Sequence, residues 1–232
     1  MPESPARTLL IAVVISLICS AMVSAAVHWL RPIQAANTLM ERNRALVTAA
    51  GIVGADASDA AVRDAYLGLD ARVWDLAKHE YNALAYGRSF DHWTDQVDVP
   101  ADLVPVYWVG QGQTRLVLPV HGEGMWSTIY GYVALGADLN TITGIAFHRH
   151  GETPGIGDRI QDPAWLKSWL GKRIYSSTHH VGLAASAQGE VDPVHRIDLI
   201  TGASVTSGKA VALVRNWMGP EGYAPLLLTP DS

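Results

Sequence analysis

A run of small and hydroxyl-bearing residues near the C-terminal end gives the clearest chemical signal in the chain. The run is Thr201-Gly202-Ala203-Ser204-Val205-Thr206, and Ser207-Gly208-Lys209 follows directly. Glycine and alanine let backbone N–H groups approach an anion closely, and the first turn of a following helix adds N–H donors that lack partners within the helix. The run therefore predicts a phosphate site at the entry to a helix. Ser, Thr and Gly before a helix are equally typical of an ordinary N-terminal cap.

A second run combines turn-forming and polar residues. It extends from His150 to Asp158 and contains Glu152-Thr153-Pro154-Gly155-Ile156-Gly157. Its glycines and proline predict a tight loop after a strand, with Glu152 and Thr153 at the mouth of that loop. Without further evidence the run is also consistent with a plain Gly/Pro turn.

Composition limits the kinds of chemistry that the chain can perform. The 232 residues carry a formal net charge of −5 and no long basic run, which argues against nucleic acid as a partner. The single cysteine, Cys19, allows no intrachain disulfide and no cysteine-based metal or iron–sulfur site. His148 with His150, and His179 with His180, match no zinc spacing, so no metal site is predicted. Redox chemistry would therefore need an acquired cofactor.

The N-terminal region contains a long apolar segment. Residues 8–30 read TLLIAVVISLICSAMVSAAVHWL, which is long enough to cross a bilayer. A cleaved signal peptide is the alternative, because Val23-Ser24-Ala25 resembles a cleavage site. A retained anchor is favoured because the apolar run continues to Trp29 and Leu30. Arg7 precedes the segment, whereas arginines 31, 42 and 44 follow it, so the positive-inside rule does not favour an outward domain.

The remaining chain shows helical and strand patterns in turn. Arg31-Pro32 is expected to end the span, a linking helix follows over 33–50, and a second helix is expected over 59–67 with Ser58 as its N-cap. No element is assigned between residues 74 and 102. Four strand patterns follow, over 104–109, 114–120, 125–135 and 143–150. A short helix is then expected over 163–170, and further strands over 181–185 and 195–200. A final helix is expected after Ser207. Hairpin-length connections predict an α+β fold in which helices pack on an antiparallel sheet.

Taken together, the two polar runs resemble the two signature segments of the FMN-binding domain family. Over nearly its whole length the chain further resembles the family of the C subunit of the sodium-translocating NADH:quinone reductase. The segments that carry this resemblance are the N-terminal anchor with Val23-Ser24-Ala25-Ala26, the runs 124–131 and 139–145, the loop 152–157, the run 201–206 and the tail 217–223. The implied organisation is an N-terminal tail (1–7), a transmembrane anchor (8–30), a helical linker with the first part of the soluble domain (31–102) and the FMN-binding domain (103–232).

The resemblance assigns roles to individual residues. Thr206 would carry FMN as a phosphoester, formed by a separate flavin transferase from FAD, so no base is required beside it. Gly202, Ala203, Ser204 and Val205 would hold the phosphate, and Lys209 would offset its charge. Trp126 would lie against the isoalloxazine ring, unless it is a core tryptophan. Glu152, Thr153, Ile156 and Gly157 would line the flavin edge.

The implied function is a membrane-anchored electron carrier in a sodium-pumping complex. Electrons would pass from NADH, through other subunits and this FMN, to ubiquinone, and no acid–base catalytic residue or directly bound small-molecule substrate is expected in this chain. The soluble domain in this family lies outside the bacterial cytoplasmic membrane. Two alternatives remain: the G subunit of an Rnf-type electron-transport complex, and a non-redox envelope module in which Thr206 merely caps a helix.

Overall fold

The computed structural model describes residues 4–82, 102–110, 114–186 and 191–229. The chain divides into two units, residues 1–41 and residues 42–232. The first unit is helical, and the second contains the sheets and the remaining helices.

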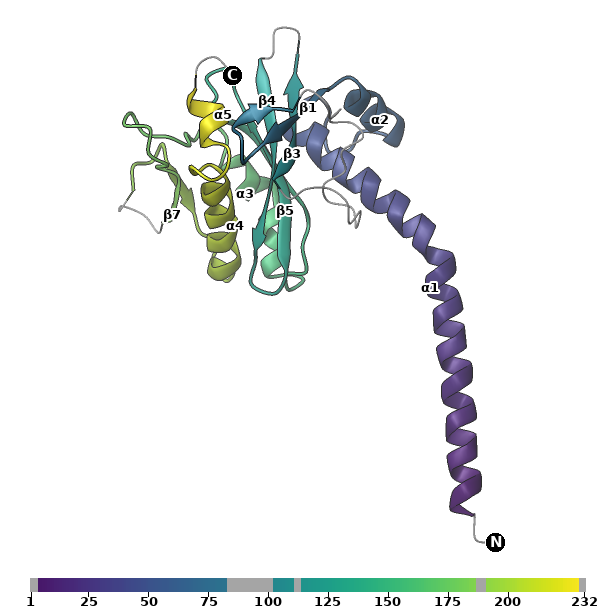
Figure 1. The fold of residues 1–232 in the computed structure, drawn as a ribbon. Helices are drawn as coiled ribbons and strands as arrows, with labels where there is room; N and C mark the ends of the chain where they lie inside the picture. Colours follow the sequence, from purple (N-terminus) through teal and green to yellow (C-terminus); the bar gives the residue numbers. More distant parts are fainter. Residues whose placement is uncertain (1–3, 83–101, 111–113, 187–190, 230–232) are drawn as a thin grey trace. The chain divides into compact units, whose positions relative to one another are not determined.

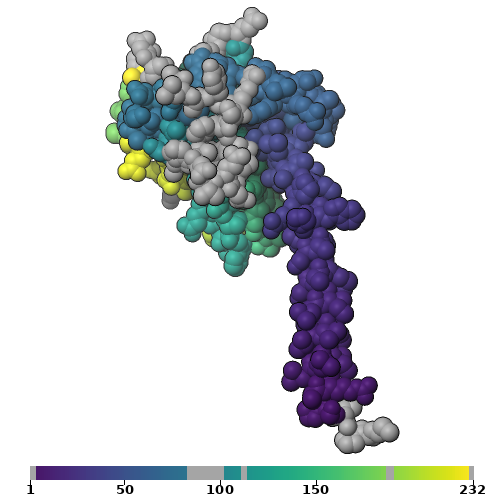
Figure 2. All heavy atoms as spheres, turned by 45° about the vertical axis from the view of Figure 1, so that its right-hand side comes forward, coloured from purple at the N-terminus to yellow at the C-terminus, as the bar shows by residue number. Residues whose placement is uncertain are grey.

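The first unit consists of most of helix α1, Pro5–Ala49, which is a single continuous helix. Large apolar side chains from Leu9 to Ile33 are exposed, and Figure 2 shows this part of the helix in purple. Among the described residues, α1 is the one helix long and apolar enough to cross a membrane. The expected anchor and the expected linking helix form one continuous helix, which passes through Pro32. Proline removes one backbone hydrogen bond, but strong helix formers such as Ala, Leu, Met, Glu and Arg dominate the following residues and continue the helix.

The second unit is built on a six-stranded antiparallel sheet. Its strands are β1 (Asp70–Asp75), β2 (Glu80–Tyr81), β3 (Leu103–Val109), β4 (Arg115–Glu123), β5 (Thr128–Leu135) and β6 (Ile142–Arg149), in the order β2-β1-β3-β4-β5-β6. Strands β3 to β6 confirm the four strand patterns and their antiparallel pairing. Strands β1 and β2 were not predicted. In β1 only Val73 and Trp74 are large apolar residues, too few to give a strand period.

Helices cover one face of this sheet (Figure 1). They are η2 (Gly157–Gln161), α3 (Pro163–Lys167), α4 (Ser204–Trp217) and α5 (Ala224–Leu228). Helix α4 packs on β4 and on η2, while α3 packs on β6. The α4 side chains Ala210, Val211, Leu213 and Val214 join one core with alternate residues of β4 to β6: Leu116, Leu118, Val120, Ile129, Val133, Leu135, Ile145 and Phe147. The predicted α+β class with helices packed on an antiparallel sheet is therefore confirmed.

Helix boundaries follow local capping chemistry. Helix α2 (Asp59–Leu67) has the predicted bounds, and the Ser58 hydroxyl accepts a hydrogen bond from the Ala61 N–H. Helix α4 begins at Ser204 rather than after Ser207, because Gly202 adopts a positive φ of 84° and turns the chain directly into the helix. Thr206 consequently lies in the first turn of α4.

Two short strands lead into that turn. Strands β7 (Ala184–Ser186) and β8 (Arg196–Asp198) lie within or next to the predicted strand segments, but they pair with each other in parallel, apart from the main sheet. The indole N–H of Trp165 donates to the carbonyl of Asp198 at 2.8 Å. This contact ties the end of β8, just before residues 201–206, to helix α3.

The last residues of α1 and helix α2 cover the opposite face of the main sheet. Leu46 and Val47 are buried, the Arg115 guanidinium donates to the Ala50 carbonyl at 2.8 Å, and the rings of Tyr66 and Tyr107 lie 6.5 Å apart. Gly144 on β6 permits this packing, because a Cβ at that position would collide with the Ala49 carbonyl oxygen.

The Gly144→Ala variant should lose stability for this reason. The Ala49 carbonyl belongs to the helix backbone and cannot rotate aside, so we expect the free energy of unfolding to fall by about 2 kcal/mol or more, as for an overpacked core. Denaturant unfolding of the full chain in detergent, followed by near-ultraviolet circular dichroism, measures the change. Gly136→Ala is the matched control, because the nearest atoms to its Cβ would lie 3.4 Å away. Equal stabilities of the two variants would contradict the packing argument.

Candidate functional site

The two polar runs of the sequence meet at a hydrogen bond between Thr206 and Glu152. The Thr206 hydroxyl, in the first turn of α4, donates to Oε2 of Glu152 at 2.7 Å. The two residues are separated by 54 positions in sequence, and they are only 3 % and 4 % exposed. The fold therefore brings together two runs that the sequence could only pair by resemblance.

Backbone donors hold the Glu152 carboxylate from its other side. The N–H of Trp126 donates to Oε1 at 3.1 Å. Burial by itself would raise the pKa of Glu152, but hydrogen bonds from the Trp126 N–H and the Thr206 hydroxyl, with further help from the N–H groups of Ser127 and Met125, hold it below its ordinary value. The carboxylate is thus charged at neutral pH. Gly157 makes room for it, because a Cβ there would lie 2.8 Å from the Glu152 Cβ and 3.2 Å from the Thr206 hydroxyl.

The N-terminus of α4 offers an anion site. Its N-cap residue is Ala203, and in the described part of the chain no side chain caps this end. The N–H groups of Ser204, Val205 and Thr206 therefore have no acceptor within the helix. The Ser207 hydroxyl accepts from the Ile200 N–H at 3.1 Å and donates to the Ala203 carbonyl at 2.8 Å, which fixes the loop before the helix. Unpaired donors at a helix N-terminus favour an anion such as a phosphate.

A cavity of about 250 Å³ opens between these groups. It is lined by Met125, Trp126, Thr153, Ile156, Gly157 and residues 202–206. Met125, Trp126, Ile156 and Val205 expose apolar surface at this cavity, and Trp126 is 68 % exposed. The alternative in which Trp126 is a core tryptophan is therefore wrong, and its indole is available to a planar aromatic ligand.

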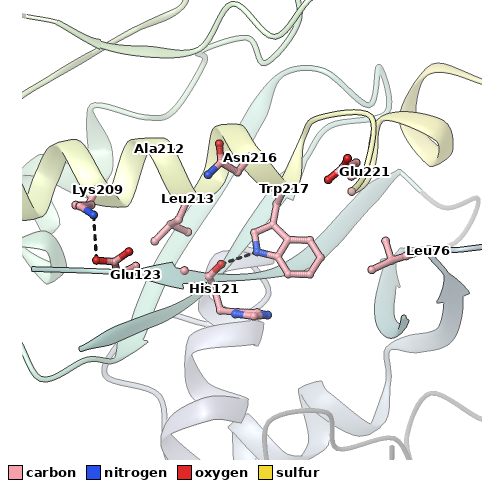
Figure 3. Close-up of a pocket in the computed structure, with 11 residues that line it drawn as sticks. Leu76, His121, Glu123, Lys209, Ala212, Leu213, Asn216, Trp217 and Glu221 are labelled. Carbon is pink, nitrogen blue, oxygen red and sulfur yellow. Dashed lines mark hydrogen bonds and ion pairs between the residues drawn. The ribbon is translucent and has the colours of Figure 1, made fainter. Parts of the chain in front are cut away.

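The predicted partner Lys209 lies elsewhere. Figure 3 shows it in a neighbouring groove, where its ammonium lies 3.4 Å from the Glu123 carboxylate and Trp217 donates its indole N–H to the His121 carbonyl. The structure thus does not bring Lys209 together with the residues that line the cavity. The other predicted site residues do lie together. Glu152 contacts Thr206, and the cavity is lined by residues 126, 153, 156, 157 and 202–206.

Two features of the site were missed in the sequence. Arg159 donates to the Thr201 carbonyl at 3.0 Å and places a positive charge beside the run 201–206. Glu152 was expected at the flavin edge and no base was considered necessary beside Thr206, whereas the Glu152 carboxylate contacts the threonine hydroxyl. An acidic residue inside a Gly/Pro loop was the available signal, but contact across 54 positions depends on the fold.

One of the histidines considered in the sequence, His148, lies outside the cavity. His148 on β6 stacks on Tyr132, with ring centroids 5.5 Å apart, and burial lowers its pKa to about 4. The described residues hold no group of three or more His, Cys, Asp or Glu side chains arranged to bind a metal ion.

Comparison with known proteins assigns the chain to a family. The profile of the FMN-binding domain matches residues 124–219, which include both polar runs. The C subunit of the Na(+)-translocating NADH-quinone reductase of Pseudomonas aeruginosa is 33 % identical, over 97 % of this chain and 95 % of that protein. The corresponding C subunit from Neisseria meningitidis serogroup B is also 33 % identical, over 97 % and 94 %. The chain belongs to the C-subunit family of Na⁺-translocating NADH-quinone reductases.

Solved structures agree with this assignment. The crystal structure of NqrC from Shewanella oneidensis matches with a TM-score of 0.68 at 28 % identity, covering 80 % of this chain and 94 % of that one. The C-subunit structure from Parabacteroides distasonis has a TM-score of 0.72 at 23 % identity, covering 87 % and 98 %, and supports the fold. The family resemblance drawn from the sequence is confirmed. The cavity, the apolar Trp126 face and the uncapped α4 N-terminus fit the ring and the phosphate of FMN.

The charged state of Glu152 should make stability depend on pH. Because its pKa is lowered in the folded protein, its contribution is present at neutral pH and is lost as the pH falls through the folded pKa. We expect the Glu152→Gln variant to lose less unfolding free energy than the wild type between about pH 6 and about pH 3. This pH range brackets the ordinary pKa of a glutamate.

Denaturant unfolding of the full chain at several pH values measures this difference. Glu123→Gln is the matched control, since it removes an exposed carboxylate at the end of β4 that has no contact with Thr206 among the interactions described. Parallel pH profiles for the wild type and Glu152→Gln would show that the carboxylate is not held in its charged form.

Proposed function

We propose that this chain is the FMN-carrying, membrane-anchored electron-transfer subunit of an Na⁺-translocating NADH-quinone reductase, with FMN linked to Thr206 through its phosphate. The observation that carries this proposal is the placement of the Thr206 hydroxyl at the uncapped N-terminus of α4, on the wall of a cavity inside the FMN-binding domain. A helix cap alone would not need a hydroxyl at this position, because Thr206 lies three residues after the N-cap.

Each part of the site has a distinct task in this proposal. The N–H groups of Ser204, Val205 and Thr206 bind the phosphate, and Arg159 supplies the positive charge that was first assigned to Lys209. Trp126 and Ile156 provide apolar surface for the ring, while Thr153 and Gly157 border it. FMN, when bound, supplies reversible electron transfer. In this proposal the chain acts as an electron carrier, and the cavity holds the flavin.

The partners follow from the family. Other subunits of the same complex deliver electrons from NADH and pass them on to quinone, and sodium transport is a property of that complex. A separate flavin transferase would form the phosphoester, with FAD as the donor. Neither nucleic acid nor a freely diffusing substrate binds directly to this chain.

We place α1 in the bacterial cytoplasmic membrane as a single span, with residues 42–232 on the periplasmic side. The apolar character of residues 8–30 supports the span. The arginines that follow the span argue against this orientation, and the proposal rests on the family. Fusions of alkaline phosphatase and of green fluorescent protein to the C-terminus test it. Phosphatase activity without fluorescence is expected, and the opposite pattern would place the domain in the cytoplasm.

Replacing Thr206 should abolish flavin attachment without unfolding the domain. The Thr206→Val variant keeps the branched side chain and removes the hydroxyl, so we expect a folded full chain with no covalent FMN after co-production with a flavin transferase. Intact mass and in-gel flavin fluorescence measure attachment. Loss of the hydrogen bond to Glu152 should lower stability by about 1–3 kcal/mol, since it leaves a buried charged acceptor short of one donor.

Thr201→Ala is the matched control for this experiment, because Ser204 is itself assigned to the phosphate site. It removes an exposed hydroxyl from the loop directly before α4 and should still gain one FMN. Covalent FMN on the Thr206→Val variant would show that the attachment residue is assigned incorrectly.

A further inference from the structure

The Thr206 hydroxyl points at a carboxylate that is held in one orientation. Oε1 of Glu152 accepts the Trp126 N–H at 3.1 Å, while Oε2 accepts the Thr206 hydroxyl at 2.7 Å. The two oxygens therefore have different partners, one on the 123–128 hairpin and one on α4. A carboxylate fixed in this way presents a lone pair to the hydroxyl proton of Thr206, a residue that lines the cavity.

A purely structural role does not account for the charge. Burying an ionised carboxylate costs free energy, and a neutral glutamine could link the same hairpin and helix by hydrogen bonds. The backbone donors instead stabilise the ionised form of Glu152. This arrangement is that of a nucleophile with an adjacent base, in which the base lies within hydrogen-bond reach of the hydroxyl.

We propose that Glu152 is the proton acceptor for Thr206 when the threonine oxygen is joined to the flavin phosphate. The inference rests on the proposed attachment at Thr206. It adds that this chain, which receives the flavin, also supplies the base for the attachment reaction. The flavin transferase would then present FAD to a hydroxyl that is already oriented.

The step balances without an oxidant or a reductant. The Thr206 oxygen forms a bond to the phosphorus on the riboflavin side of FAD, and the bond from that phosphorus to the bridging oxygen breaks. AMP leaves with the bridging oxygen. The hydroxyl proton passes to Oε2 of Glu152 and then to solvent or to AMP, which restores the carboxylate.

Charge balance in the product follows from the same geometry. The new phosphodiester carries one negative charge beside the Glu152 carboxylate, and the uncapped N–H groups of α4 with Arg159 offset it. Glu152 keeps the Trp126 N–H as a partner after Thr206 has lost its proton.

The rate of FMN attachment to the purified full chain tests the inference. The chain in detergent is mixed with a flavin transferase and FAD over a range of pH from acidic to alkaline, and intact mass gives the initial rate. For Glu152→Gln we expect the rate to fall by a factor of about 100 or more, the usual contribution of a general base, with FMN still mapped to Thr206. Glu123→Gln should retain the wild-type rate.

A second variant separates proton transfer from folding. Glu152→Ala opens space beside Thr206, and added formate should restore its rate by a factor of about ten or more, increasing with formate concentration, because formate supplies the missing base. A merely structural role predicts no recovery. The inference is overturned if Glu152→Gln matches the wild-type rate, or if a folded Glu152→Ala variant is unaffected by formate. If the wild-type chain itself gains no FMN on Thr206, the proposed attachment fails, and this outcome is distinct from the failure of Glu152 alone.

Discussion

The packing of α4 on β4 is the contact on which the site depends. The apolar side chains of α4 share one core with Leu118 and Val120 of β4. The segment after α4 is held by the Tyr223 hydroxyl, which donates to the Pro119 carbonyl at 2.8 Å. This packing sets the N-terminus of α4 beside the hairpin that joins β4 to β5 and beside the loop that follows β6. Thr206, Trp126 and Glu152 meet because three separate chain segments reach the same end of one sheet. A shift of the helix along the strand would separate the threonine from the carboxylate.

The same packing explains why the site combines buried and exposed parts. The Thr206 hydroxyl and the Glu152 carboxylate are nearly covered by protein, so their mutual hydrogen bond is strong and directional. Trp126 and Ile156 remain open to solvent a short way along the same cavity. A cofactor held by its phosphate at the covered end would present its ring at the open end, and this suits a carrier that must exchange electrons with neighbouring subunits.

Much of this architecture could be predicted from the sequence, because its signals are local. The strand patterns of β3 to β6 have clear apolar runs, and Ser58 marks the start of α2 through ordinary capping chemistry. Strand β1 was not predicted because its sequence has no strand pattern of its own. It forms by pairing with β3, and Val73 and Trp74 are buried there. The continuation of α1 through Pro32 depends on the summed propensity of its neighbours rather than on the proline. The family resemblance named most of the residues that the fold gathers around the cavity. The contact between Glu152 and Thr206 and the position of Lys209 away from the cavity depend on tertiary packing, which local sequence patterns do not encode.

The most direct test of the account is a mass spectrum of the chain isolated from its native membrane, followed by peptide mapping of residues 198–209. We expect a mass increase that corresponds to one FMN joined through its phosphate, located on Thr206. An unmodified chain from membranes that contain an active flavin transferase would contradict it, and so would FMN on a different residue.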